Sequence, residues 1–215
     1  MKQWNKIYKK HKSYGAPLDD IDDLIKLFKR NNISKVLDLG CGSGKHLAYL
    51  VEHGFNVYGI DISEEGIKAA KSFLKRKKLK GNLKKGSIYK KLPYKENFFD
   101  AVLSLRVLNH GKITEIRKAI REIKRVLKPG GFIFITVQKV TTRKKEKIRK
   151  INSIKVKMID SRTYFPLEGR EKGIVHFIFN KKVLRKEFKE FKINKLWLKK
   201  GKEKWERYYY LFGEL

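Results

Sequence analysis

The fold is decided by residues 36–44, whose sequence is VLDLGCGSG. The stretch begins as a short apolar run, which is typical of a buried strand, and ends in three glycines directly before a helix-like segment at 45–53. Glycine permits a tight turn and lets a ligand approach the backbone, and the N-terminus of a helix attracts negative charge. A strand, a glycine loop and a helix in this order are typical of a nucleotide-binding α/β unit.

Apolar runs alternate with amphipathic helical patterns over the first two-thirds of the chain. We expect strands at 35–39, 56–61, 99–105 and 132–137, with helices before, between and after them. Strands that are almost continuously apolar are typical of a parallel sheet covered on both faces. The sequence therefore predicts an α/β fold built on a doubly wound, mostly parallel sheet.

The last third of the chain has a different pattern. A basic run at 141–150 is followed by a strand-like stretch at 173–180 and a helical pattern at 182–191. The closing pair of apolar segments, 193–198 and 207–212, predicts an antiparallel hairpin at the edge of the sheet.

Composition sets the broad class. The 215 residues include 54 Lys and Arg against 22 Asp and Glu, a formal net charge of +32, yet 41% are hydrophobic, which excludes a disordered tail. No apolar run approaches the ~20 residues that span a bilayer, so we expect a cytoplasmic protein without a membrane partner. A single cysteine excludes an intramolecular disulfide and a cysteine-based metal cluster, and we expect no metal.

The charge excess has two explanations. A polyanionic partner such as RNA would compensate the self-repulsion of so many like charges. A compositional cause, such as a hyperthermophilic source, a Lys-rich genome or a high-salt cytoplasm, would leave the charges spread evenly. The sequence alone leaves both open.

An acidic residue ends the second expected strand. Asp61 follows Gly44 by seventeen positions, where a carboxylate can accept hydrogen bonds from both hydroxyls of a ribose. A negative charge there disfavours a ribose 2′-phosphate. The expected ligand is therefore an adenosine-type nucleotide or nucleoside.

These features resemble the class I S-adenosylmethionine-dependent methyltransferases. Residues 36–44 look like the first motif of that family, because Asp38 stands where nicotinamide-binding domains usually have an aliphatic residue. Further matches follow in order and at family spacing, at 57–61, 86–93, 99–102 and 125–131. The resemblance implies an enzyme with a Rossmann-like, seven-stranded sheet that binds S-adenosyl-L-methionine and releases S-adenosyl-L-homocysteine.

The resemblance also implies an organisation of the chain. All of 1–215 is expected to form a single methyltransferase domain. Its parts are an N-terminal lid at 1–18, a cofactor-binding core at 20–138, a basic insertion at 139–172, and a C-terminal helix and hairpin at 173–215.

The resemblance assigns cofactor contacts to those residues of this chain that match the family's motifs by position. The resemblance assigns the methionine part of the cofactor to the first motif, the ribose to Asp61, and the adenine to Ile62. The first-motif residues are Asp38, Gly40, Cys41, Gly42 and Gly44.

Two further positions follow from the same resemblance. Ser87 stands where the family usually has an Asp for the adenine amino group, so the Ile88 backbone N–H is an alternative contact, and both are otherwise ordinary loop residues. Leu105 and Arg106 fall where the fourth motif closes over the methyl sulfonium.

Candidates for the acceptor side are few. A sulfonium methyl is already activated, so the enzyme mainly positions a nucleophile, and a base is needed only if the acceptor must lose a proton. Candidate catalytic residues are His110 with its neighbour Asn109, His176, and Tyr14. The alternatives are that His110 caps the next helix and that His176 is an ordinary strand residue.

The flanking segments bear on the acceptor. We expect two basic segments to border the cleft, where they could bind RNA phosphates: the N-terminal lysines interleaved with Trp4, Tyr8 and Tyr14, and the insertion at 143–150. The insertion also fits a solvated basic helix. Weaker resemblances point to methyltransferases of tRNA wobble uridines and to tellurite-resistance and other small-molecule methyltransferases. The leading expectation is a tRNA substrate, with small-molecule methylation or a non-catalytic cofactor-binding partner subunit as alternatives.

Overall fold

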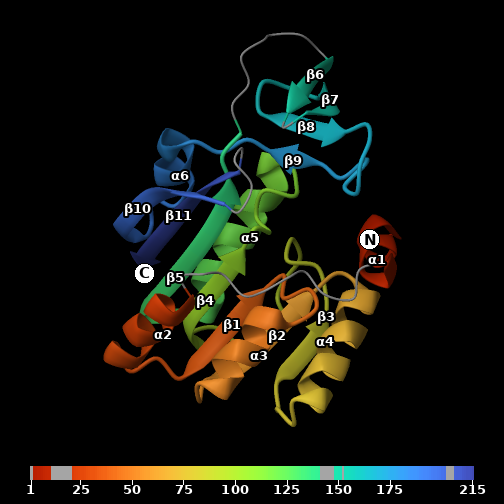
Figure 1. Ribbon diagram of the computed structural model, residues 1–215. Coiled ribbons are helices and arrows are strands. Elements are labelled where there is room, and N and C mark those ends of the chain that lie inside the picture. The colour runs from red at the N-terminus through yellow and green to blue at the C-terminus, as the bar shows by residue number, and fades with distance from the viewer. Residues whose placement is uncertain (1, 11–20, 141–147, 152, 202–205) are drawn as a thin grey trace.

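The computed structural model describes residues 2–10, 21–140, 148–151, 153–201 and 206–215. Figure 1 shows a large sheet covered by helices and, beyond one end of it, a smaller sheet. The large sheet has seven strands in the order β10-β11-β5-β4-β1-β2-β3. Its strands are β1 (Lys35–Leu39), β2 (Asn56–Asp61), β3 (Asn82–Lys85), β4 (Phe99–Leu105), β5 (Leu127–Gln138), β10 (Lys192–Lys200) and β11 (Arg207–Glu214).

The strand directions agree with the expected fold class. Strands β1 to β5 pair in parallel, whereas β11 is antiparallel to both β5 and β10. The expectation of a Rossmann-like, mostly parallel sheet with a C-terminal antiparallel hairpin at its edge is confirmed.

Helices cover both faces of this sheet, because alternate strand residues point to opposite sides. Leu37 and Leu39 pack with α5 and α6 in one core, whereas Val36 packs with α2, α3 and α4 in the other. The helices are α1 (Lys2–Lys10), α2 (Ile21–Arg30), α3 (Lys45–Glu52), α4 (Glu64–Arg76), α5 (Ile113–Val126) and α6 (Lys181–Glu187).

The smaller sheet was not predicted. Its four antiparallel strands lie in chain order, and its own core includes Val156, Met158 and Tyr164. Lys155 and Lys157 alternate with Val156 and Met158, so this segment reads as a basic run although it has the period of a strand. Its strands are β6 (Ile148–Ile151), β7 (Ile154–Met158), β8 (Thr163–Pro166) and β9 (His176–Phe177).

Three expectations for the last third are therefore corrected. The alternative of a basic helix at 143–150 is wrong for 148–150, which belong to β6, whereas 143–147 lie outside the described residues. The strand expected at 173–180 is limited to β9, and α6 ends before Phe188 rather than at Phe191.

The first helix lies near the carboxyl end of β2. Helix α1 contacts α4, where the Ser63 hydroxyl donates to Asn5 Oδ1 at 2.7 Å, and Ile7 is buried. Ser63 also caps α4, because its Oγ accepts from the Gly66 N–H at 3.1 Å. Among the described residues, no helix has the length and apolar character needed to cross a membrane.

Candidate functional site

The glycine loop after β1 is fastened to the end of β2. The backbone N–H groups of Gly40 and Cys41 donate to the Ile60 carbonyl at 2.8 and 3.1 Å. Gly40 has a φ of 83°, and a Cβ added there would overlap the side chain of Val107. Only glycine therefore combines this backbone conformation with the close approach to the loop after β4.

Asp61 holds the same loop from the side of β2. Its Oδ2 accepts from the Gly42 N–H at 2.9 Å and its Oδ1 from the Ser63 N–H at 2.8 Å. Burial raises the pKa of Asp61, and these backbone donors oppose that rise. Each oxygen keeps acceptor capacity, so the carboxylate can still receive hydroxyl donors from a ligand.

Asp38 lies beneath the loop rather than in the wall of the cavity. It is 2% exposed, and its Oδ2 has no hydrogen-bond partner among the described residues. Burial, followed by the charge of Asp61, raises the pKa of Asp38 to about 7, and nearby Lys45 opposes this. An unpartnered carboxylate in this position is suited to a cationic ligand above the loop.

A large cavity opens above these groups, with a volume of about 1040 Å³. Tyr8 from α1 reaches so far over the loop that a Cβ added at Gly42 would lie 2.3 Å from its hydroxyl. Of the expected cofactor residues, Asp38 and Gly44 do not border the cavity. Those that do are Gly40, Cys41, Gly42, Asp61, Ile62, Ser87, Ile88, Leu105 and Arg106.

The residues expected at the adenine and the sulfonium have fixed geometry. The Ser87 hydroxyl accepts from the Tyr89 N–H at 3.2 Å, so part of its hydrogen-bonding capacity stabilises its own turn. Arg106 has a φ of 61°. Its backbone N–H donates to both the carbonyl oxygen and the hydroxyl oxygen of Thr136, each at a nitrogen–oxygen distance of 3.0 Å. Its guanidinium lies 4.0 Å from the centre of the Tyr208 ring, a cation–π contact.

The smaller sheet and the loop after β4 form the opposite wall. Asn109 is buried with an unpartnered Oδ1, as far as the described residues show, and the Phe177 N–H donates to its carbonyl at 2.7 Å. The His110 ring lies edge-on to those of Trp4 and His176, at 4.9 and 4.8 Å. The structure thus brings together three of the four expected acceptor-side residues, while Tyr14 lies outside the described residues.

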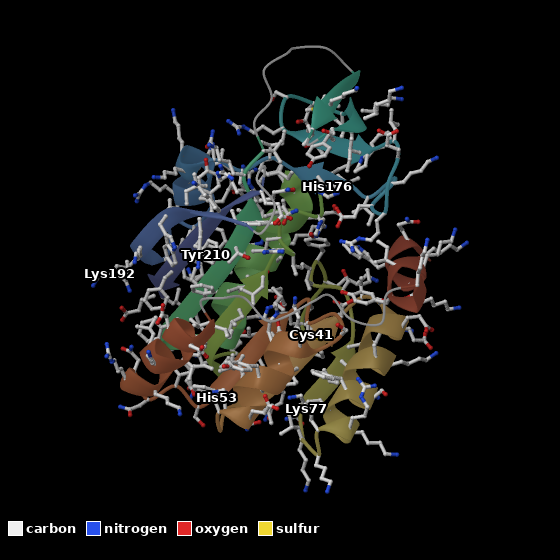
Figure 2. The ribbon with its side chains drawn as sticks, viewed as in Figure 1. Cys41, His53, Lys77, His176, Lys192 and Tyr210 are labelled. Atoms are coloured by element: carbon white, nitrogen blue, oxygen red, sulfur yellow. The ribbon has the colours of Figure 1, made fainter. Side chains whose placement is uncertain are left out.

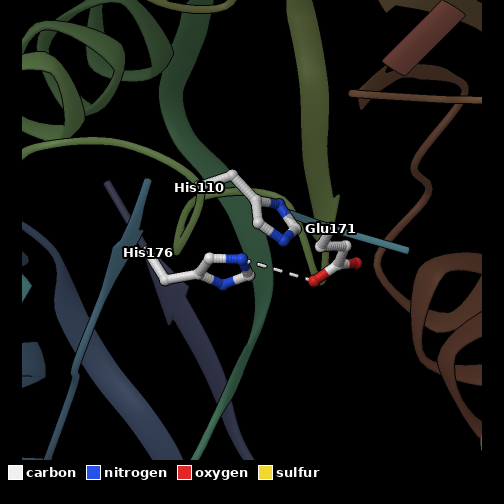
Figure 3. Close-up of side chains that lie close together, drawn as sticks. All are labelled: His110, Glu171 and His176. Atoms are coloured by element: carbon white, nitrogen blue, oxygen red, sulfur yellow. Dashed lines mark ion pairs between the residues drawn. The ribbon is translucent and has the colours of Figure 1, made fainter. Parts of the chain in front are cut away.

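His176 belongs to β9, and its surroundings were only partly foreseeable. Its ring stacks on that of Tyr164 at 5.0 Å, and its Nε2 lies 3.3 Å from Glu171 Oε2 (Figure 3). Glu171 was not among the expected site residues. It lies in the loop between β8 and β9, where no local sequence motif distinguishes it.

Both site histidines are neutral at pH 7. Burial lowers the pKa of His110 to about 4. Burial and then the neighbouring His110 lower the pKa of His176 to about 4, and Glu171 opposes this. Each ring therefore carries a nitrogen lone pair at the acceptor side of the cavity.

The cavity wall is mixed in charge. Seven basic and five acidic side chains border it, a smaller basic excess than in the whole chain. Lys199 and Lys200 are among the basic ones, whereas the 75–78 cluster does not border it. Figure 2 shows Lys77 at the opposite end of the molecule from His176, with Cys41 between them.

Sequence comparison supports the first motif and the strands around it. Residues 37–135 match the family described as a methyltransferase domain. Over 105 residues, the chain is 42% identical to a tRNA (carboxymethyluridine(34)-5-O)-methyltransferase of Arabidopsis thaliana, covering 48% of this chain and 24% of that protein. Over 119 residues it is 34% identical to a ubiquinone biosynthesis O-methyltransferase of Dechloromonas aromatica, covering 55% of this chain and 49% of that protein. The chain thus spans half or less of the length of these relatives.

Structural comparison extends over the whole chain. The fold is similar to that of an S-adenosylmethionine-dependent methyltransferase from Clostridium acetobutylicum, with a TM-score of 0.69 and 16% identity over 100% of this chain and 98% of that one. Residues 37–135 therefore resemble a methyltransferase domain, and the chain shares the fold of a solved S-adenosylmethionine-dependent methyltransferase.

Proposed function

We propose that the chain is a methyltransferase that binds S-adenosyl-L-methionine over the glycine loop and transfers its methyl group to RNA, specifically tRNA. The observation that carries the proposal is that one cavity is bordered both by the loop at 40–42 with Asp61 and by the acceptor-side group Asn109, His110 and His176. A cofactor held at the loop would direct its methyl group toward that opposite wall.

The first-motif residues would bind and orient the cofactor. Asp61 would receive the ribose hydroxyls, and Ile62, Ser87 and Ile88 would surround the adenine, since all four residues border the cavity. The α-ammonium and the sulfonium are cationic, so the buried charge of Asp38 beneath the loop would favour both.

The reaction needs positioning more than acid–base chemistry. A lone pair of the acceptor forms the new bond to the methyl carbon, and the carbon–sulfur bond breaks with its electron pair passing to sulfur. Trp4, Tyr8 and residues of the smaller sheet border this space and would restrict the access of water once the ligands are bound. The neutral rings of His110 and His176 present lone pairs on the acceptor side.

An RNA acceptor is supported by the surface at the mouth of the cavity. Helix α1 supplies Trp4 and Tyr8 to the wall, and the same helix carries the exposed Lys2, Lys6 and Lys9, which do not themselves border the cavity. Lysines next to aromatic rings suit a strand whose phosphates lie outside while one base enters to stack. The relative that modifies a tRNA uridine points the same way.

The test is methyl transfer to RNA. Purified chain and labelled S-adenosyl-L-methionine are incubated with tRNA from cells that lack the gene and with tRNA from cells that have it. Label is expected only in the first tRNA, in one nucleoside identified by mass spectrometry, and transfer should fall steeply with salt. Absence of label from both tRNAs would contradict the RNA proposal.

A small-molecule acceptor is the second candidate. The mixed charge of the cavity wall favours it, because basic residues are not concentrated there as they would be for phosphate binding alone. Transfer to phenolic or other small acceptors that is insensitive to salt would support it. The third alternative is a non-catalytic partner subunit. It would be supported if the chain binds cofactor alone but methyl transfer occurs only after a copurified protein is added back.

A further inference from the structure

We propose that His110, Glu171 and His176 bind a divalent transition-metal ion in the acceptor-side wall of the cavity. Their ligating atoms all lie within 4.8 Å of one another. Figure 3 shows the two rings and the carboxylate converging from different segments of the chain. Two imidazoles and one carboxylate form a donor set that suits Zn²⁺ and other first-row divalent ions.

The spacing is close to that of an assembled site. Zinc bonds of ~2.0–2.2 Å place neighbouring ligand atoms of a tetrahedral site roughly 3.3–3.5 Å apart. His176 Nε2 and Glu171 Oε2 are already 3.3 Å apart. The third ligand atom, on His110, lies within 4.8 Å of both.

Unsatisfied polar atoms point to a missing ligand. Both ring nitrogens of His176 are buried and make no hydrogen bond to a described residue. Burial of a polar atom without a partner is unfavourable, and an ion would give one of these nitrogens a partner. The stacked ring of Tyr164 holds His176 in place, so its orientation is set before an ion arrives.

An ion can reach the cluster from the solvent. The Glu171 side chain is 32% exposed, which leaves a path for the ion from the solvent.

An ion here would join the two sheets. His110 follows β4 of the main sheet, whereas Glu171 and His176 belong to the segment that carries β8 and β9. Three protein ligands leave a coordination position open toward the cavity, where an acceptor oxygen or water could bind. The inference concerns ion binding alone and holds whether or not the acceptor is RNA.

The experiment is direct metal titration. Untagged, full-length chain is stripped with a chelator and titrated with Co²⁺, followed by visible absorption, and with Zn²⁺, followed by equilibrium dialysis. About one ion per chain is expected. His110→Gln, Glu171→Gln and His176→Gln should each weaken binding by about tenfold or more, because each removes a ligand.

The control is Glu168→Gln. Glu168 borders the same cavity, and its Oε1 accepts from the Lys155 N–H at 2.7 Å, a bond that glutamine can also accept. This variant should bind the ion as the parent does. Two results would overturn the proposal. One is binding of less than about 0.2 ion per chain. The other is unchanged ion affinity in the ligand variants whose circular dichroism shows that they are folded.

Discussion

Asp61 Oδ2 accepts a 2.9 Å hydrogen bond from the Gly42 N–H, which joins the end of β2 to the glycine loop nineteen residues earlier in the chain. The bond places a carboxylate and a backbone turn on the same side of the cavity. The shape of the glycine loop and the position of the Asp61 carboxylate therefore depend on each other. Substitutions in this part of the site should have measurable effects.

Gly42→Ala should abolish cofactor binding, and its loss of folding stability should not be enough to explain this. Gly42 has a φ of 54°, and a Cβ there would collide with the Tyr8 hydroxyl at the cofactor side of the loop. Gly54→Ala is the matched control, because Gly54 has a φ of 91° but open space around it. Both variants should lose about 1 kcal/mol or more in urea unfolding from backbone strain. Equal affinity of the two for S-adenosylhomocysteine would refute the placement of the ligand.

The histidine pair should make the protein sensitive to acid. Unfolded imidazoles titrate near pH 6.5, whereas the pKa values of His110 and His176 in the fold are about 4. Between those values the unfolded state binds more protons, so the stability present above pH 6.5 is lost as the pH falls toward 4.

Replacement of one ring tests this dependence. His176→Gln should remove up to about 1.4 kcal/mol per pH unit from the slope of unfolding free energy between pH 4 and 6.5. Urea unfolding in the presence of chelator provides the measurement. His53→Gln, which changes a ring outside the cavity wall, serves as control, and an identical slope in all three proteins would exclude the neutral, buried pair.

Asp38 should link cofactor binding to proton release. Its pKa is raised to about 7 without ligand, so the folded state holds a proton that the unfolded state loses near pH 4, and stability falls as the pH rises between these values. A cation bound above the loop lowers that pKa. Calorimetry of S-adenosylmethionine binding at pH 6.5 in buffers of different ionisation enthalpy should show net proton release that disappears in Asp38→Asn. Equal release in both proteins would assign the proton to another group.

Charge removal at α1 should weaken RNA binding. The variant in which Lys6, Lys9 and Lys10 become alanine loses three exposed charges from the helix that supplies Trp4 and Tyr8 to the cavity wall. Its affinity for tRNA should fall and the salt slope should decrease by roughly two to three.

The matched control removes three charges from the far end of α4. Lys75, Arg76 and Lys80 are exposed there and do not border the cavity. Replacing these three by alanine should leave tRNA affinity nearly unchanged. Equal losses in the two triple variants would assign the basic excess to composition.

The sequence predicted those parts of the structure that depend on residues close together in the chain. Residues 36–44 and Asp61 predict the loop and its carboxylate, because a strand, a turn and a helix each have a short-range pattern. The seven-stranded order with its antiparallel edge was also predictable. His110 and His176 were each singled out, but sixty-six positions separate them, and nothing in the sequence shows that their rings meet.

The rest depends on pairing between distant segments. The strands of the smaller sheet are two to five residues long, and in β7 lysines alternate with the buried residues, so the basic run concealed the period of that strand. Glu171 enters the site only because β8 and β9 pair and return the intervening loop to the cavity. Such contacts follow from the fold and have no local motif.

The most direct test of the central claim is calorimetric titration of the chain and of Asp61→Ala with S-adenosylhomocysteine. The account predicts one site per chain, in the micromolar range typical of enzyme ligands, and a loss of about 1–3 kcal/mol in the variant. Asp100→Ala is the control, because Asp100 accepts from the N–H groups of Ser34 and Lys35 and does not border the cavity. No binding by the parent chain at about millimolar ligand, or equal affinity of parent and Asp61→Ala, would contradict it.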